Sequence, residues 1–228
     1  MDWRLILLAL IVAACTVWVV VWYVTQPAGS SSVVSITTTI KDGKTQFDSP
    51  ENLPRSFNQD PGAAFSYACW VKVNNFTYRY GEPKCIFNKG PADLSSMCPA
   101  LFLDATTNAF IVKLDTYGGT EVVPVSNIPA QKWVHVAIAV AQDSMDIYIN
   151  GTLYLHNSLV QLPKQNSDTV RTGIAGGFDG QIAALQYYPY LLDPSSVKSI
   201  MASTPQADPN SVGTLPPYFD TSFWVNHY

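Results

Sequence analysis

The sequence predicts an all-β domain, a sandwich or a barrel, preceded by one membrane-spanning helix. Beyond the first 24 residues, apolar side chains recur with a period of two rather than 3.6. Short runs rich in β-branched and aromatic residues alternate with Gly, Pro, Asn and Asp turn signals, as in sandwiches and barrels. Glutamate, which long helices favour, occurs only at Glu51, Glu82 and Glu121.

The first segment, residues 5–24, contains twenty residues without a charged side chain. At a rise of about 1.5 Å per residue, a helix of this length spans about 30 Å, the thickness of the hydrocarbon core of a bilayer. Trp3 lies at one end of the run and Trp22 and Tyr23 at the other, where aromatic rings favour the headgroup region. We therefore expect a transmembrane anchor over residues 1–24, with membrane lipid as its partner through residues 5–24.

Two alternatives exist for this segment. A cleaved signal peptide has a shorter apolar core and a small-residue cleavage site, whereas Thr25-Gln26-Pro27 follows this run. Val12-Ala13-Ala14-Cys15 resembles a lipoprotein signal, but the apolar run continues beyond Cys15. Arg4 and the free amine, opposed by Asp2, favour a cytosolic N-terminus. We expect a single-pass membrane protein whose C-terminal domain lies on the translocated side.

The rest of the chain divides into a linker over residues 25–34, a domain over 35–203 and a tail over 204–228. About 200 residues suffice for one domain with a core of its own. The net charge of −4 is spread without long runs of either sign. This composition argues against a nucleic-acid partner.

The domain begins with strands that alternate between two faces. Residues 33–40 form a β-branched run that ends in the hairpin signal Lys41-Asp42-Gly43-Lys44. Residues 64–73 place Phe65, Tyr67, Cys69, Val71 and Val73 on one face and Trp70 on the other, which indicates an internal strand. Further strands are expected at Lys84–Asn88, Ala100–Asp104, Ala109–Asp115 and Thr120–Val125.

The second half contains the most apolar strand, residues 133–141, which should be central. Residues 145–150 end in Asn150-Gly151, whose positive φ angles suit a type I′ turn, so residues 152–156 should pair with them. Residues 181–188 form the last strand. A short helix follows, capped by Asp193, with Pro194 at its first position, and it ends near Ser203.

Three cysteines lie beyond the predicted anchor. Cys85 and Cys98 flank a turn-rich stretch and would be able to form a disulfide on an oxidising side of the membrane. The alternative is that these two cysteines and Cys69 are all reduced and buried or half-buried.

The tail contains four prolines and ends in an aromatic cluster. An exposed aromatic cluster is costly unless it is covered. It is therefore the best candidate for binding a partner, with the alternative that it folds back on its own domain. The candidate partner-binding residues are Tyr218, Phe219, Phe223, Trp224 and Tyr228.

Taken in order, several stretches resemble a laminin-G-like module of the concanavalin A-like lectin/glucanase superfamily. They are FSYACWVKV, CIFNKG, the strand that begins Lys132-Trp133-Val134-His135, the segment 146–151, the segment 176–182 and the helix after LLDPSS. The resemblance spans residues 35–203 and implies a two-sheet antiparallel jelly-roll sandwich. In such a sandwich we expect structural roles: Trp133 between the sheets, Asn150-Gly151 closing a hairpin, and Gly180 at a close turn.

The residues do not predict catalysis. Glucanases of this fold carry Glu-x-Asp-x-x-Glu on one strand, and none of the three glutamates has an acidic residue two positions away. Asp143 and Asp146 are three residues apart across a turn, and no two histidines have metal-ligand spacing. Some members of the superfamily bind Ca²⁺ at the rim, but we interpret Asp104, Asp115 and Asp179 as solvated turn residues. We expect no catalytic residue, no metal and no cofactor.

The sequence thus favours a non-enzymatic, membrane-anchored binding or structural protein. Membrane-tethered domains of this superfamily resemble proteins of large DNA viruses, so the favoured hypothesis is a minor capsid protein of the virion that links a membrane to a protein shell and contacts other structural proteins. One alternative is a lectin-like cell-surface receptor or adhesin that binds a glycan. Another is a degenerate glycoside hydrolase.

Overall fold

The computed structural model of the chain describes residues 33–49, 53, 54, 56 and 64–203, together with Arg4, Cys15, Thr16 and Trp18. The chain divides into two units, Met1–Ser32 and Val33–Tyr228. The four described residues of the first unit are helical. Among the described residues, no helix is long and apolar enough to cross a bilayer. Apart from the residues named, the predicted anchor and linker lie outside the described part of the chain, as does the predicted tail.

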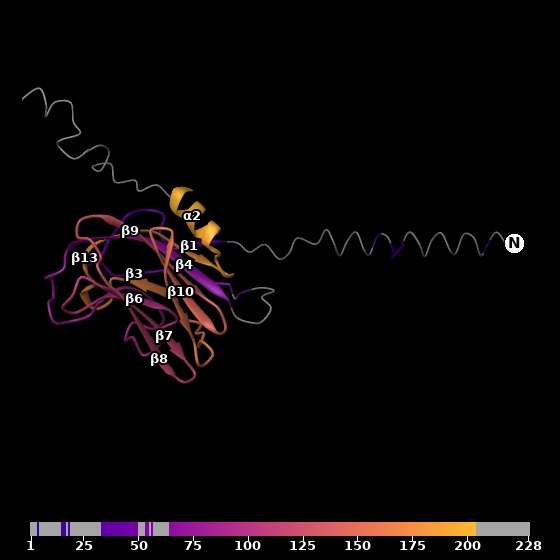
Figure 1. Cartoon of the computed structure of the whole chain (residues 1–228), viewed down its shortest axis with the longest axis horizontal. Coiled ribbons are helices and arrows are strands. Elements are labelled where there is room, and N and C mark those ends of the chain that lie inside the picture. The colour runs from indigo at the N-terminus through magenta and orange to yellow at the C-terminus, as the bar shows by residue number, and fades with distance from the viewer. Residues whose placement is uncertain are drawn as a thin grey trace, which may run out of the picture. The chain divides into compact units, whose positions relative to one another are not determined.

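The second unit is an all-β sandwich of two antiparallel sheets, with the helix α2 (Pro194–Ser203) beside it (Figure 1). The first sheet has seven strands, in the order β1 (Val34–Ser35), β13 (Asp179–Tyr188), β4 (Phe65–Asn75), β9 (Trp133–Val140), β10 (Ser144–Ile149) and β11 (Thr152–Ser158), with β2 (Lys41–Asp42) also paired to β13. The second sheet has six strands, in the order β3 (Phe47–Asp48), β12 (Val170–Thr172), β5 (Lys84–Lys89), β6 (Ala100–Leu103), β7 (Phe110–Thr116) and β8 (Gly119–Val125).

The main core lies between the two sheets and is built by strand alternation. On β4, Phe65, Tyr67, Cys69, Val71 and Val73 all belong to this core, which confirms the face predicted for them. The strand β9 pairs with β4 on one side and with β10 on the other, so its predicted central position is confirmed. Burial of these apolar side chains provides the main driving force for folding.

Two local predictions at the C-terminal half are also confirmed. Asn150 and Gly151 have φ angles of 48° and 74° and close the hairpin between β10 and β11. Asp193 caps α2, because its Oδ1 accepts hydrogen bonds from the backbone N–H groups of Ser195 and Ser196 at 2.8 and 3.0 Å.

The N-terminal hairpin prediction is wrong. Only Val34–Ser35 of the β-branched run forms a strand, and both β1 and β2 pair with β13 rather than with each other. After the turn at residues 43–44 the chain enters the second sheet as β3, which pairs with β12. The turn therefore carries the chain from one sheet to the other. Pairing partners far away in sequence decided this, and a local turn signal cannot reveal them.

The predicted position of Trp133 is also wrong. The inward-facing residues of β9 are Val134, Val136, Ile138 and Val140, which belong to the core between the sheets. Alternation therefore places Trp133 on the outer face of the first sheet, where its ring is half-buried.

Small side chains line the middle of that outer face and allow α2 to pack closely. Ala68 of β4 and Ala137 and Ala139 of β9 form a second apolar cluster with Tyr148, Tyr188, Leu192 and Val197. Ser66 completes the seam, since its hydroxyl donates to Tyr190 O and accepts from the N–H of Leu192. Together these contacts fix the helix over β4 and β9.

Candidate functional site

One end of the sandwich contains a cavity of about 600 Å³, which we call the end cavity. It lies where β4 begins and where β5 and β13 end, and Tyr117 of the β7–β8 turn and residues of the segment 163–168 also line it. Its volume falls in the range of ligand pockets in proteins. Its lining residues are Leu53, Pro54, Phe65, Tyr67, Lys89, Cys98, Tyr117, Pro163, Gln165, Asn166, Ser167, Asp168 and Tyr187.

Aromatic rings form much of its wall. The ring of Tyr67 lies 5.1 Å from that of Tyr187 and 6.1 Å from that of Phe65, centroid to centroid. The Tyr187 hydroxyl donates to Pro54 O at 2.8 Å. Tyr117 stands at the mouth with 71% of its surface exposed. The cavity therefore has several aromatic rings in its lining.

Tyr67 also brings a phenol to the lining of the cavity. Its side chain is 98% buried, since its relative exposure is 2%. No described residue forms a hydrogen bond with its hydroxyl, and burial raises the pKa of this phenol well above its ordinary value. The phenol of Tyr67 is therefore neutral at ordinary pH where it lines the end cavity.

A buried lysine holds the loop that forms the opposite wall. The Nζ of Lys89 donates to Asn166 O and Asn166 Oδ1, both at 3.2 Å, and to the carbonyl of Asp168. Asn166 Nδ2 in turn donates to Lys89 O at 2.9 Å and to Ser96 Oγ at 3.2 Å. Burial lowers the pKa of Lys89, and the nearby carboxylate of Asp168 opposes this effect. The loop 163–168 is therefore a preformed wall.

The buried thiols are not arranged for chemistry. Cys85 and Cys98 are free and buried, and the pairing considered from the sequence is not formed. Cys98 belongs to the core between the sheets, whereas Cys85 belongs to a cluster with Ala100, Phe102 and Ile174. Burial raises the pKa of Cys69, Cys85 and Cys98 to about 12, so all three are protonated at neutral pH.

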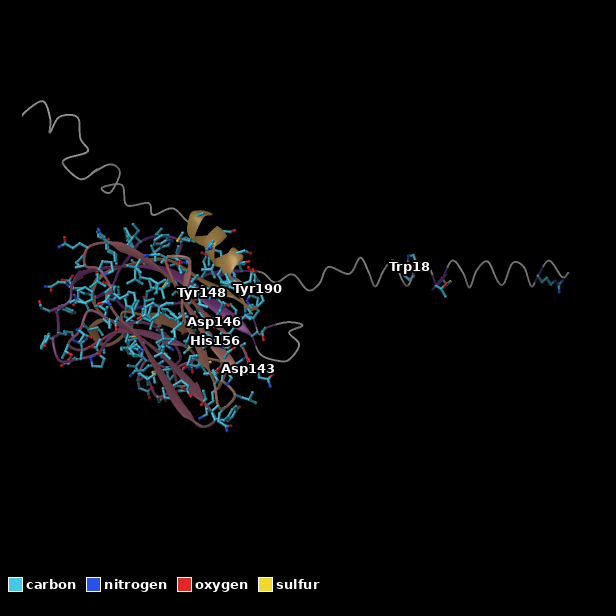
Figure 2. The ribbon with its side chains drawn as sticks, in the orientation of Figure 1. Trp18, Asp143, Asp146, Tyr148, His156 and Tyr190 are labelled. Carbon is cyan, nitrogen blue, oxygen red and sulfur yellow. The ribbon has the colours of Figure 1, made fainter. Side chains whose placement is uncertain are left out.

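A second group of polar side chains lies on the outer face of the first sheet (Figure 2). Asp146 of β10 faces His156 of β11, with 2.5 Å between Oδ1 and Nδ1. Tyr148 hydrogen-bonds to Asp146, and burial together with this carboxylate raises the pKa of the phenol. A His–carboxylate pair activates a nucleophile only through the second ring nitrogen. Among the described residues, no hydroxyl or thiol is seen to hydrogen-bond to His156, so the pair has no nucleophile to activate there.

The aspartates weighed as calcium ligands have separate partners. Asp104 Oδ2 accepts hydrogen bonds from Thr106 and Thr107, which lower its pKa to about 2. Asp115 accepts from Met97 N and Thr120 Oγ1, and Asp179 pairs with Lys44 at 3.1 Å. Within the described part of the chain, no three His, Cys, Asp or Glu side chains could hold one metal ion. The candidate partner-binding aromatics Tyr218, Phe219, Phe223, Trp224 and Tyr228 lie outside the described residues.

The end cavity was not predicted from the sequence. Its residues come from seven separated segments, and only their pairing into two sheets brings them together. The FSYAC stretch did place Tyr67 in the core, but that it lines a cavity is visible only once its neighbours are known. Nothing in the local sequence distinguishes Lys89 or Asn166 from ordinary surface residues.

Comparison with protein families gives one match. The model described as the concanavalin A-like lectin/glucanases superfamily matches residues 41–198, more than half of the chain. No curated protein sequence matches the chain.

Solved structures with the same fold include receptor-binding domains of botulinum neurotoxins. The serotype D binding domain aligns with a TM-score of 0.54 at 13% identity, over 76% of this chain and 46% of the other. The ligand-binding domain of serotype D in complex with N-acetylneuraminic acid aligns with a TM-score of 0.53 at 15% identity, over 75% and 50% of the two chains. The binding domain of botulinum neurotoxin DC in complex with rat synaptotagmin II aligns with a TM-score of 0.53 at 15% identity, over 75% of this chain and 46% of the other. The aligned part of this chain thus corresponds to half of those chains or less.

Proposed function

The chain belongs to the concanavalin A-like lectin/glucanases superfamily, and we propose that it is a non-enzymatic binding protein that residues 5–24 tether to a membrane. In this proposal the end cavity receives the terminal saccharide unit of a glycan. The observation that carries the proposal is a cavity of about 600 Å³ at one end of the sandwich, lined by the aromatic residues Tyr67, Tyr117 and Tyr187.

The chemistry of the cavity suits a saccharide. A pyranose ring has apolar C–H faces, which pack on aromatic rings, and hydroxyl groups, which need hydrogen-bond partners. Tyr117 and Tyr187 supply ring faces, while the Tyr67 hydroxyl and the side chain of Gln165 supply polar partners. A preformed wall at residues 163–168 limits the ordering cost of binding.

The non-enzymatic part of the proposal is supported by the carboxylates. Glu82 pairs with Arg79 in the turn before β5, and Glu121 lies on the strand β8 at the edge of the second sheet. A retaining or inverting glycosidase needs two carboxyl groups that flank one sugar bond. Among the described residues that line the end cavity, Asp168 is the one acidic residue.

Glycan binding by the full chain in lipid nanodiscs tests the proposal. A glycan array selects the ligand, and calorimetry then measures its affinity. We expect Tyr67→Phe to weaken binding of the selected glycan three- to tenfold, about the contribution of one hydrogen bond. The same substitution should leave the melting temperature unchanged, because no described protein partner is lost. Removing the rim aromatic with Tyr117→Ala should weaken binding about tenfold.

Tyr80→Ala is the matched control for the rim substitution, because Tyr80 is also exposed but does not line the cavity. It should bind the glycan as the unmodified chain does. A chain that binds no glycan on the array, or equal binding by the Tyr67→Phe variant, would overturn the saccharide proposal.

A second candidate is the structural role, a minor capsid-associated protein that links a membrane to a protein shell. The strand β11 favours it, because β11 ends the first sheet and exposes Leu153, Tyr154 and Leu155. An unprotected apolar edge strand is suited to pair with another protein. Under this hypothesis Leu153→Lys with Leu155→Lys reduces incorporation into particles without affecting glycan binding. Normal incorporation of that double variant would contradict it.

The predicted partner-binding aromatics belong to the same candidate. Deleting residues 218–228 should leave the sandwich folded and weaken binding to the partner. A sandwich that unfolds on this deletion would instead assign the aromatic end to the core.

A further inference from the structure

The outer face of the first sheet carries four side chains beyond α2 that we call the outer patch: Trp70, Lys72, Trp133 and His135. In the register of β4 and β9, Trp70 is opposite His135 and Lys72 is opposite Trp133. The Trp70 and His135 rings lie 5.1 Å apart in an edge-to-face arrangement. Lys72 Nζ lies 6.0 Å from the centre of the Trp133 ring. Two half-buried tryptophans thus lie at diagonal positions of neighbouring strands on one sheet face.

Three polar atoms of the outer patch are buried and have no hydrogen-bond partner. They are the indole Nε1 atoms of Trp70 and Trp133 and the Nδ1 of His135. His135 itself is 99% buried, since its relative exposure is 1%. A buried polar group without a partner costs about 1–3 kcal/mol. Three such atoms among four neighbouring residues indicate a surface that another segment with hydrogen-bonding groups completes.

The helix α2 leads the chain to this patch. The helix begins beside Ser66, whose hydroxyl accepts a hydrogen bond from the N–H of Leu192. Its Val197 then packs with Ala68 and Ala137, the next outward-facing residues along β4 and β9. A Cβ on Gly151 would lie 3.3 Å from Met201, so the end of α2 lies at the β10–β11 turn. His135 is adjacent to that turn, because its N–H donates to Asn150 Oδ1 at 2.9 Å.

The dimensions agree with this course. Ten residues of α2 advance about 15 Å, and the four residues from Ser66 to Trp70 advance about 13 Å along β4. The chain therefore leaves α2 next to Trp70 and His135. Twenty-five residues follow Ser203, and the first fourteen contain Pro205, Pro209, Pro216 and Pro217.

We propose that residues 204–217 dock in an extended, polyproline-like conformation across the outer patch. Polyproline II segments have no internal hydrogen bonds, so their carbonyl groups are free to accept. Aromatic grooves recognise such segments by packing proline rings between aromatic side chains. In this arrangement the indole N–H groups of Trp70 and Trp133 donate to carbonyls of the segment, and Pro205 and Pro209 pack against the two rings.

The docked segment acts as a strap that fixes where residues 218–228 leave the domain. The outer patch and the end cavity share no residue. The strap therefore stands independently of glycan binding, and each proposal can fail without the other.

Indole N–H signals test the strap directly. The full chain is labelled with ¹⁵N-tryptophan in detergent micelles, and the Trp70 and Trp133 signals are assigned by their loss in Trp70→Phe and Trp133→Phe. We expect deletion of residues 204–228 to speed solvent exchange of both indole protons at least tenfold. The double substitution Pro205→Ala, Pro209→Ala should also speed this exchange. Deletion of residues 218–228 alone is the control and should leave the exchange rates unchanged.

A stability cycle gives a second measurement. Deleting residues 204–228 should lower the melting temperature of the unmodified chain. In the Trp70→Phe, Trp133→Phe double variant the same deletion should have a smaller effect, because the donors are already absent. Identical exchange with and without the tail, or additive effects in the cycle, would overturn the proposal. Exchange rates that depend on protein concentration would also overturn it, since they would indicate a second copy as the occupant.

Discussion

At the scale of single residues, burial keeps the reactive groups of the sandwich neutral. Cys69, Cys85 and Cys98 are protonated thiols because each is buried among apolar side chains. The phenol of Tyr67 and the imidazole of His135 are neutral for the same reason. These side chains serve packing and hydrogen bonding, which agrees with a binding function.

The thiols provide a first prediction. In the native protein a maleimide reagent should leave Cys69, Cys85 and Cys98 unmodified at neutral pH, because burial both covers them and raises their pKa to about 12. All three should react after denaturation without a reductant. Mass spectrometry of tryptic peptides counts the labels. A Cys85–Cys98 cross-linked peptide in unreduced protein would contradict the buried, unpaired positions of the structure.

His135 gives a pH-dependent prediction. Burial lowers its pKa from 6.5 to about 4, so the unfolded chain binds a proton that the folded chain excludes. Above about pH 6.5 the histidine is neutral in both states and the free energy of unfolding is not reduced. As the pH falls from 6.5 toward 4, protonation of His135 in the unfolded chain lowers the free energy of unfolding by about 3 kcal/mol in total. Urea unfolding between pH 4 and 7.5 measures it. In His135→Gln this part of the slope should disappear, and an unchanged slope would refute the assignment.

At the scale of elements, the outer seam of the first sheet decides where α2 sits. Ala68, Ala137 and Ala139 leave room for Val197 and Leu192 to reach the sheet. The sequence predicted the helix and its cap at Asp193 from local signals alone. It did not predict the packing partner of the helix, because four small residues on two strands become a seam only when β4 and β9 pair.

The seam can be filled to test its role. Ala137→Leu places a larger side chain beneath α2 without entering the core between the sheets, and we expect a destabilisation of about 1–3 kcal/mol. Chemical denaturation measures the loss, and limited proteolysis should show cleavage near residues 190–203. Thr152→Leu is the control, because it adds similar bulk to an exposed position on β11. Equal stability of the two variants would show that α2 does not depend on the seam.

Strand pairing also explains which elements the sequence predicted poorly. The long alternating runs that became β4 and β9 were recognised, since their own side chains specify both faces. The two-residue strands β1, β2 and β3 were not, because each exists only through its partner, β13 or β12. Short strands have too few residues to show a period.

At the scale of the whole molecule, the membrane tether remains a prediction from composition. Removing residues 1–24 should move the chain from the membrane fraction to the aqueous fraction without changing the melting temperature of the sandwich. Replacing residues 5–24 with an unrelated apolar helix of equal length should restore membrane association. Alkaline carbonate extraction followed by immunoblotting measures both. Recovery of the full-length chain in the carbonate supernatant would refute the tether.

The sequence by itself determined the all-β class, the core face of β4, the central place of β9, the Asn150-Gly151 hairpin and the capped helix. Each of these depends on side chains within one short segment, where alternation, turn chemistry and capping act locally. Only the tertiary structure decided the end cavity, the outward position of Trp133 and the separation of Cys85 from Cys98. These depend on which strands pair and in which register, and a shift of one residue would exchange the two faces of a strand.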